Sequence, residues 1–136
     1  MKNNHMNLEQ IKKIMPHRPP MLLVDEAWEG GASYKIKGDE FFLDGHFPGN
    51  PVVPGVILCE MMAQSVCATL QGHLEGKTPY FTGIDGVRFR NKVLPGDTFI
   101  TEITVKKQKG PFFFLDAKGF VDGKLCVSGE LSFVLG

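Results

Sequence analysis

The chain has 136 residues, a length that fits one compact domain with a sizeable buried core. Hydrophobic residues make up 43% of it and charged residues 22%, close to the average for globular domains. The 15 basic and 15 acidic residues cancel, so the net charge gives no reason to expect nucleic acid or a membrane surface as a partner.

The N-terminal part of the chain predicts a short helix and no export signal. Residues 1–7 lack the apolar core of a secretory leader. Residues 7–15 fit an amphipathic helix that Asn7 caps, with Gln10 three residues further on. Pro16 follows and ends the helix, because proline has no N–H to donate.

Two strands are predicted next, before a long loop. They cover residues 21–28 and residues 34–42, and Gly30-Gly31 supplies the turn between them. We expect both strands to join an antiparallel sheet.

A long apolar helix is predicted over residues 54–75, where Gly76 ends it. Apolar side chains occur nearly all round this helix, and a helix without a broad polar face is normally surrounded on most sides. Glu60 and several other polar residues interrupt the stretch, which favours burial in protein over a membrane span.

The second half of the chain is predicted to be entirely β. Residues such as Phe99, Ile103 and Val105 alternate with polar positions. Asp122-Gly123 is a strong signal for a two-residue hairpin between the last two strands. The four predicted strands cover residues 80–90, 98–107, 111–121 and 124–134.

One helix with about six strands predicts a single α+β domain over residues 1–136, in which a curved antiparallel sheet wraps around the helix. So small a sheet would struggle to cover the helix completely, and we therefore expect a homodimer. The three cysteines, Cys59, Cys67 and Cys126, are odd in number. The first two lie roughly 12 Å apart on the same predicted helix, too far for a disulfide. A reduced, cytoplasmic protein is the expectation.

Glu60 is the one formally charged residue between Asp44 and Glu75, and His46 lies shortly before it in a loop rich in glycine and proline. An ionised carboxylate is costly to bury, so such a group tends to stay protonated. A neutral imidazole accepts protons near pH 7. Glu60 and His46 are therefore the candidate acid and base of an enzyme.

Two further groups favour the same chemistry. Gln64 is one helical turn after Glu60, where it can hydrogen-bond the carboxyl group and fix its rotamer. Pro54 suits the first position of the helix and Val53 offers no capping oxygen, so early amides such as that of Gly55 lie open at the positive end of the helix dipole.

A base, an acid and an oxyanion donor suit removal of a proton next to a carbonyl group with loss of a β-hydroxyl. His46 takes the proton, the Gly55 amide stabilises the enolate-like charge, and Glu60 protonates the departing oxygen. Proton abstraction alone suits an isomerase equally well.

Simpler interpretations exist for each residue. A histidine in such a loop is more often structural, and Gln64 alone is most simply a satisfied polar residue. His5, His17 and His73 show no metal-ligand spacing, so we expect no metal. The absence of GxGxxG, GxxxxGK[ST] and GxSxG patterns weakens nucleotide-binding and serine-hydrolase interpretations.

Taken together, these residues resemble the 3-hydroxyacyl-[acyl carrier protein] dehydratases of bacterial type II fatty acid synthesis. The likeness covers essentially the whole chain and is most specific around the candidate acid and base. The stretches that carry it are Gly45-His46-Phe47-Pro48-Gly49-Asn50-Pro51-Val52-Val53-Pro54-Gly55-Val56, Glu60-Met61-Met62-Ala63-Gln64, Pro16-His17-Arg18, Leu22-Leu23-Val24-Asp25, Gly83-Ile84-Asp85, Arg88-Phe89-Arg90, Val93, Pro95-Gly96-Asp97 and Val121-Asp122-Gly123.

The resemblance implies a hotdog fold and homodimers, commonly assembled as a trimer of dimers. It implies an active site shared between subunits, in which His46 of one protomer faces Glu60 of the other. The implied substrate is a 3-hydroxyacyl chain on the phosphopantetheine arm of acyl carrier protein, and the implied product is the trans-2-enoyl form. No cofactor, nucleic acid or membrane is implied.

The resemblance also implies roles for individual residues. The carbonyl group of Val52 orients the imidazole, Gly55 donates to the thioester oxygen, and Gln64 supports Glu60. We further expect a substrate tunnel along Tyr80, Phe47 and Met61, and contacts to the acidic carrier protein from Arg88, Arg90 and Lys92.

Glu60 stands where related dehydratase/isomerases usually have Asp, which favours a pure dehydratase, although some relatives with Glu also isomerise. Met61 and Pro19 depart from the usual small residue and aromatic residue of the family, and both bear on tunnel shape and chain length. Two other functions remain open: a hotdog thioesterase in which Glu60 activates water, and a silent acyl-binding subunit. Retention of both His46 and Glu60 argues against the silent subunit.

Overall fold

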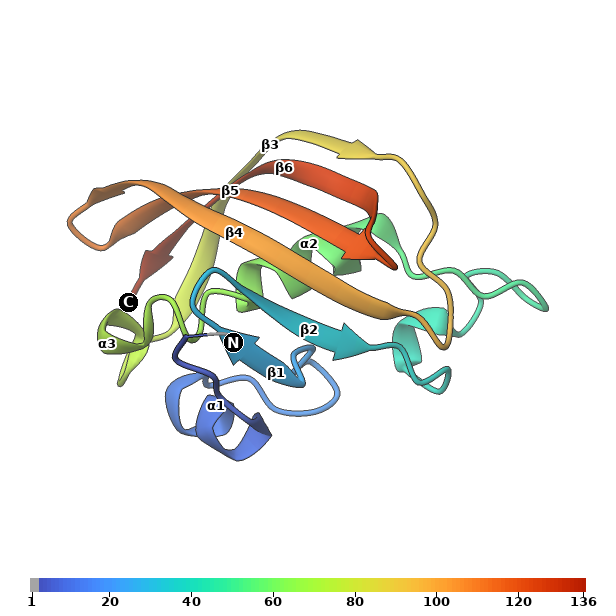
Figure 1. Ribbon diagram of the computed structural model, residues 1–136, viewed down its shortest axis with the longest axis horizontal. Coiled ribbons are helices and arrows are strands. Elements are labelled where there is room, and N and C mark those ends of the chain that lie inside the picture. The colour runs from blue at the N-terminus through green and yellow to red at the C-terminus, as the bar shows by residue number, and fades with distance from the viewer. Residues whose placement is uncertain (1–2) are drawn as a thin grey trace.

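Six strands form one antiparallel sheet in the computed structural model, which describes residues 3–136. The strand order across the sheet is β1-β2-β4-β5-β6-β3. The sheet curves around helix α2, which lies against its concave side (Figure 1). The strands are β1 (Glu26–Trp28), β2 (Gly31–Lys35), β3 (Pro79–Phe89), β4 (Thr98–Lys109), β5 (Phe112–Val121) and β6 (Lys124–Leu135). The expected α+β architecture is confirmed.

The four long strands lie where the sequence predicts them, to within two residues at either end. Asp122 and Gly123 form the hairpin turn between β5 and β6, with φ angles of 51° and 76°. Two consecutive residues in the left-handed region match the right-handed twist of the strands that they join. Alternation of apolar and polar residues and turn chemistry are thus sufficient to predict this part of the sheet.

The two N-terminal strand predictions are largely wrong. Residues 21–28 contribute only Glu26–Trp28, and residues 34–42 contribute only the end of β2 before the short 3₁₀ helix η1 (Phe41–Leu43). The chain turns instead at Gly38, whose φ is 110°, and the carboxylate of Glu40 accepts hydrogen bonds from the amides of Lys37 and Gly38. These two amides therefore donate to a nearby side chain and not to the backbone of a neighbouring strand.

Helix α1 (Leu8–Ile14) confirms the first predicted helix. The side chain of Asn7 accepts a hydrogen bond from the Gln10 amide, and the side chain of Gln10 accepts one from the Asn7 amide. This reciprocal capping satisfies two amides that a bare helix end leaves open. Ile11 is the helix residue that is fully buried.

The predicted long helix is shorter than expected. Helix α2 spans Gly55–Gln64, six residues of turns follow, and α3 covers only Gln71–Leu74. The Ser65 hydroxyl donates to the carbonyl oxygen of Met61 at 2.8 Å, and such back-bonding bends helices. The hydroxyl of Thr69 accepts from the amide of Gly30 at 2.8 Å, which ties the turns to the β1–β2 hairpin. The helix therefore ends where its polar side chains find other partners.

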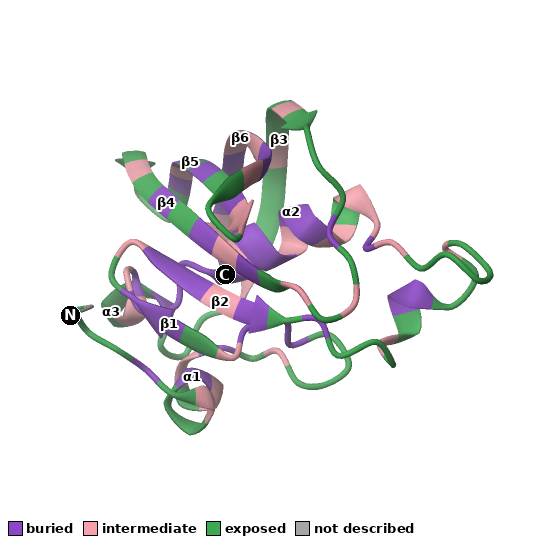
Figure 2. Cartoon of the chain, turned by 45° about the vertical axis from the view of Figure 1, so that its right-hand side comes forward, coloured by how far each residue is buried: buried purple, intermediate pink, exposed green. Residues whose placement is uncertain are grey.

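The core lies between α2 and the concave face of the sheet. Leu58, Met61 and Met62 of α2 are almost fully buried, as are Phe99 and Leu115 of the facing strands. Figure 2 shows buried residues along α2 and along the strands that cross it. The helix is not covered all round, since Val56 is 74% exposed. None of the helices in the described part of the chain is long and apolar enough to cross a membrane.

Strand β3 forms one edge of the sheet and pairs only with β6. Four large apolar side chains on this strand, Tyr80, Phe81, Ile84 and Phe89, are each at least 40% exposed. An edge strand offers unpaired backbone groups to another chain, and this one adds apolar surface. The opposite edge is partly covered, because Met6 bridges to Ala27 of β1.

Candidate active site

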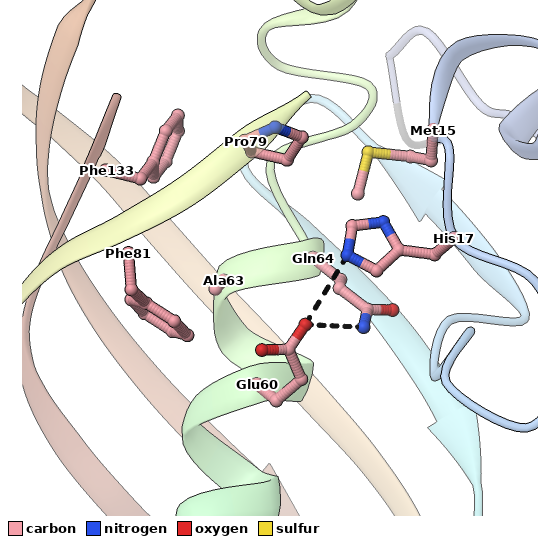
Figure 3. A pocket seen from close by; sticks show the side chains of 8 residues that line it. All are labelled: Met15, His17, Glu60, Ala63, Gln64, Pro79, Phe81 and Phe133. Carbon is pink, nitrogen blue, oxygen red and sulfur yellow. Dashed lines mark hydrogen bonds and ion pairs between the residues drawn. The ribbon is translucent and has the colours of Figure 1, made fainter. Parts of the chain in front are cut away.

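Glu60 lies in the middle of α2 with its carboxyl group turned into a cavity (Figure 3). Its side chain is 22% exposed. The Nε2 group of Gln64, one turn along the helix, donates a hydrogen bond of 2.7 Å to Oε2 of Glu60. This is the geometry that the expected supporting role of Gln64 requires.

Gln64 is itself held by the main chain of a loop. Its Oε1 accepts from the amide of Leu23 at 2.8 Å, and its Nε2 donates to the carbonyl oxygen of Met21 at 2.8 Å. An N–H donor on one side and a carbonyl acceptor on the other fix which end of the carboxamide is nitrogen. The N–H group that reaches Glu60 is therefore set by the backbone of residues 21–23.

His17 is a site residue that sequence reasoning missed. It follows α1, and its Nε2 lies 3.6 Å from Oε2 of Glu60, the same oxygen that Gln64 binds (Figure 3). Its ring is 19% exposed, and its Nδ1 atom is enclosed. Burial lowers the pKa of His17 below its ordinary value, and the nearby charge of Glu60 opposes that shift. The one sequence signal was its place in the Pro16-His17-Arg18 stretch.

The cavity beside Glu60 is small, and most of the residues that line it are apolar. Among its lining side chains, His17 and Glu60 are the two with an ionisable group. Such a mixture of an apolar wall and a few polar groups is typical of a site for an apolar substrate with one reacting centre. The cavity is lined by Met15, His17, Glu60, Ala63, Gln64, Pro79, Phe81 and Phe133.

His46 lies in the loop between η1 and α2, which extends away from the rest of the molecule (Figure 1). Its Nδ1 is 3.0 Å from the carbonyl oxygen of Val52, and the Val52 amide donates to the His46 carbonyl oxygen at 2.8 Å. A carbonyl oxygen only accepts, so Nδ1 carries a proton, and in the neutral ring the lone pair is on Nε2. The ring of Phe47 stacks on the imidazole with 4.3 Å between centroids. Nε2 of His46 is thus the free basic atom.

His46 opens on a second hollow, a groove separate from the Glu60 cavity. The groove also contains Gly55, the first residue of α2, where no side chain caps the helix. Arg90 and Lys92 lie on the same groove and are exposed. The structure therefore gathers His46, Gly55 and two cations in one place, and Glu60 with Gln64 in another.

Gly55 sits at a point of close approach. A Cβ atom added there would lie 2.7 Å from the ring of Phe89, closer than real Cβ contacts allow. A side chain at this position would have to displace the ring of Phe89, which also lines the groove.

The remaining predicted site residues lie apart from the Glu60 cavity. Tyr80 and Phe47 are both more than half exposed, and Arg88 is exposed on β3. Met61 points into the core with 1% exposure and does not line the Glu60 cavity, and its place along a substrate tunnel stays a prediction. On α2 its position faces the sheet, while Glu60 next to it faces the cavity.

Cys59, Cys67 and Cys126 are buried thiols without disulfides. Burial raises the pKa of Cys67 to about 11, which keeps this thiol protonated near neutral pH. Within residues 3–136, no three His, Cys, Asp or Glu side chains form a group suited to a metal ion.

Comparison with known proteins places this chain in a family. The model of the FabA-like domain matches residues 15–130. The chain is 46% identical to the 3-hydroxyacyl-[acyl-carrier-protein] dehydratase FabZ of Clostridium perfringens, over 96% of this chain and 99% of that protein. It is 44% identical to the enzyme of the same name from Caldicellulosiruptor bescii, over 95% and 98% of the two chains.

Solved structures agree on the fold. The dehydratase heterocomplex ApeI:P from Xenorhabdus doucetiae superposes with a TM-score of 0.76 at 19% identity, over 93% of this chain and 90% of that one. The fluoroacetyl-CoA thioesterase FlK gives a TM-score of 0.66 at 13% identity, over 79% and 87%. Likeness at such low identity concerns the fold alone, and it confirms the expected hotdog architecture. The chain belongs to the FabA-like family of hotdog proteins, as a homologue of the FabZ 3-hydroxyacyl-[acyl-carrier-protein] dehydratases.

Proposed function

We propose that this protein dehydrates 3-hydroxyacyl chains on acyl carrier protein to trans-2-enoyl chains. The observation that carries the proposal is an oriented base and an oriented carboxyl group, His46 and Glu60, in a chain 46% identical to a dehydratase of that name. The apolar cavity beside Glu60 suits an acyl chain.

The reaction is an elimination in which one C–H bond and one C–O bond break. Nε2 of His46 takes the proton from C2, and that electron pair forms the double bond to C3. Glu60 gives its proton to the hydroxyl group on C3, which leaves as water. The amide of Gly55 stabilises negative charge on the thioester oxygen as C2 loses its proton. No electrons are gained or lost, so the proposed reaction needs no redox cofactor.

A shared site in a homodimer would bring the two reacting groups together. His46 and Glu60 of one chain line different hollows, and the loop that carries His46 extends outward. The apolar edge strand β3 offers the surface on which a second copy can extend the sheet. In the proposed dimer, His46 of each protomer serves Glu60 of the partner subunit. Further assembly into a trimer of dimers is part of the same proposal.

The proposed entrance for the acyl carrier protein lies beside His46. Arg90 and Lys92 border that groove, and Arg88 precedes them on β3. Exposed cations at the mouth of a site attract an acidic partner and orient it during encounter. The phosphopantetheine arm would then reach past Gly55 toward the imidazole.

The experiment that tests the proposal is a product assay with a 3-hydroxyacyl thioester. Formation of enoyl thioester with no free thiol supports dehydration, while free thiol with no enoyl product would indicate a thioesterase. Binding without either product would indicate a silent acyl-binding subunit. Chromatography of the enoyl product separates the trans-2 isomer from any shifted double bond, which detects added isomerase activity.

A further inference from the structure

Two side-chain nitrogen atoms face one oxygen atom of Glu60, one of them hydrogen-bonded to it and the other just beyond hydrogen-bond distance. Gln64 Nε2 donates to Oε2 at 2.7 Å, and His17 Nε2 lies 3.6 Å from the same atom. The other oxygen, Oε1, is turned away from both donors, on the side of Phe81 (Figure 3). The two carboxyl oxygens therefore have different surroundings.

The tautomer of His17 follows from its burial. Its Nδ1 atom is enclosed and has no hydrogen-bond partner among the described residues. A buried N–H group without an acceptor is costly, so the proton of the neutral ring belongs on Nε2, beside Glu60. A doubly protonated ring would place that same unpaired N–H at Nδ1, and the lowered pKa of His17 agrees with a neutral ring.

The segment that carries His17 is fixed at both ends. The guanidinium group of Arg18 donates to the carbonyl oxygens of Met15 at 2.9 Å, His17 at 2.7 Å and Lys12 at 3.0 Å. Gln64 binds the main chain of the loop that follows. The imidazole is thus held against Glu60 by contacts that do not depend on a substrate.

We propose that His17 is a positioning residue that acts through Glu60: as a neutral Nε2–H group 3.6 Å from Oε2, it closes to hydrogen-bond distance as that oxygen gains charge, joins Gln64 in holding Oε2 and so leaves Oε1 as the atom that carries the reacting proton. This inference rests on the proposed dehydration. When Glu60 gives up its proton, the two donors face a carboxylate, and hydrogen bonds to a charged acceptor are about twice as strong as neutral ones. The stabilisation therefore grows as the reaction proceeds, which is what lowers a barrier.

The lack of charge on His17 is part of this role. A cation at 3.6 Å would favour an ionised Glu60 before the substrate arrives, and an ionised carboxyl group has no proton to give. Glu60 is the one titratable side chain that faces His17 in the cavity, and the Arg18 charge is directed at carbonyl oxygens instead.

The test compares His17→Gln with His17→Leu in the full-length protein. The amide nitrogen of glutamine can take the place of Nε2 and donate without titrating, whereas leucine fills similar volume without a donor. We expect His17→Gln to stay within about threefold of wild-type kcat and His17→Leu to lose about tenfold or more, with little change in KM. The alkaline limb of the rate profile should move to higher pH in His17→Leu only.

Equal rates and equal pH limbs in His17→Leu and wild type would overturn the inference. So would equal losses in both variants, since a donor would then not be what matters. Thermal unfolding of both variants tests the fold. Independently of activity, ¹⁵N NMR of the wild-type ring should show the neutral Nε2–H tautomer near pH 7, and an Nδ1–H or doubly protonated ring would contradict the assignment. Wild-type protein without dehydration would instead refute the proposed function and leave the tautomer result standing.

Discussion

His46 and Glu60 of the same chain line two different hollows, one in a projecting loop and one inside the curve of the sheet. Each side chain is already oriented, His46 by Val52 and Glu60 by Gln64. The two oriented groups do not meet within one chain. A site that a second copy completes requires this arrangement.

Mixing two inactive variants should therefore restore activity. His46→Ala and Glu60→Gln each remove one reacting group, and each homodimer should be inactive. In a mixed dimer, the intact His46 of one chain faces the intact Glu60 of the partner subunit, so one site of two survives. Random co-assembly should give roughly a quarter of wild-type activity, because about half of the dimers are mixed. An inactive mixture with proven subunit exchange would contradict the shared site.

Replacement of Gln64 by leucine should affect both stability and rate. The change leaves the buried amide of Leu23 and the partly buried carbonyl group of Met21 without their side-chain partner, and it removes the donor to Glu60. We expect a loss of about 2–4 kcal/mol in the free energy of unfolding and a fall in kcat of about tenfold or more. Urea unfolding and steady-state kinetics measure the two effects. Gln71→Leu is the matched control: its one long hydrogen bond to Ala68 should cost within about 0.5 kcal/mol.

Gly55→Ala should disturb the groove more than the fold. The new methyl group would displace the ring of Phe89, which is more than half exposed and able to move. We expect kcat/KM to fall while the free energy of unfolding changes by about 1 kcal/mol or less. Phe89→Ala removes the ring and makes room for the methyl group. In that background, Gly55→Ala should no longer lower kcat/KM, so the double variant should match Phe89→Ala alone. Gly72→Ala, where a methyl group meets open space, should leave kcat/KM unchanged.

His17 should make stability depend on pH in a defined direction. Burial holds its pKa below the ordinary 6.5, so between the two values the unfolded chain binds a proton that the folded chain does not. The contribution of the neutral His17 ring to the free energy of unfolding is fully present above pH 6.5. This contribution decreases as the pH falls below 6.5, until the pKa of the folded state is reached. Urea unfolding at about pH 7.5 and about pH 5.5 should show a larger loss for wild type than for His17→Gln. An equal loss in both proteins would count against a buried, neutral ring.

Charge reversal beside His46 should weaken use of carrier-bound substrate alone. In an Arg90→Glu, Lys92→Glu variant, KM for the acyl carrier protein substrate should rise by about tenfold, and the effect should shrink in high salt. KM for a short pantetheine thioester should stay near wild type, because that substrate has no acidic protein surface. Lys13→Glu on α1, away from the groove, is the control. Equal losses on both substrates would show that the cations act on the site itself.

The sequence predicts well those elements of the fold that depend on residues close together in the chain. The alternation along β4, β5 and β6 and the Asp122-Gly123 turn are local signals, and all of these elements are present. The sequence does not predict the break after Gln64, where Thr69 accepts a hydrogen bond from Gly30, because that contact joins distant parts of the chain. The pattern of residues 34–42 predicts a strand, but the Glu40 carboxylate accepts hydrogen bonds from two amides that a strand would use.

The candidate site shows the same difference between local signals and contacts that depend on tertiary folding. Glu60 and Gln64 are one helical turn apart, so periodicity is enough to pair them. His17 comes close to them only through tertiary folding, and no sequence pattern around this histidine predicts that Glu60 is its neighbour. The expected place of Met61 along the substrate tunnel rests on the family resemblance, and within one chain its side chain is buried in the core.

Met15 and Phe133 come from near opposite ends of the chain, yet they form walls of the same cavity. During synthesis, this chamber stays open on one side until β6 has left the ribosome and docked beside β3. A truncated product that ends after β5 would keep Glu60 and Gln64 but would have no closed compartment for a hydrocarbon tail. The cavity beside Glu60 is thus completed in the last stage of folding of each chain, together with the closure of the core.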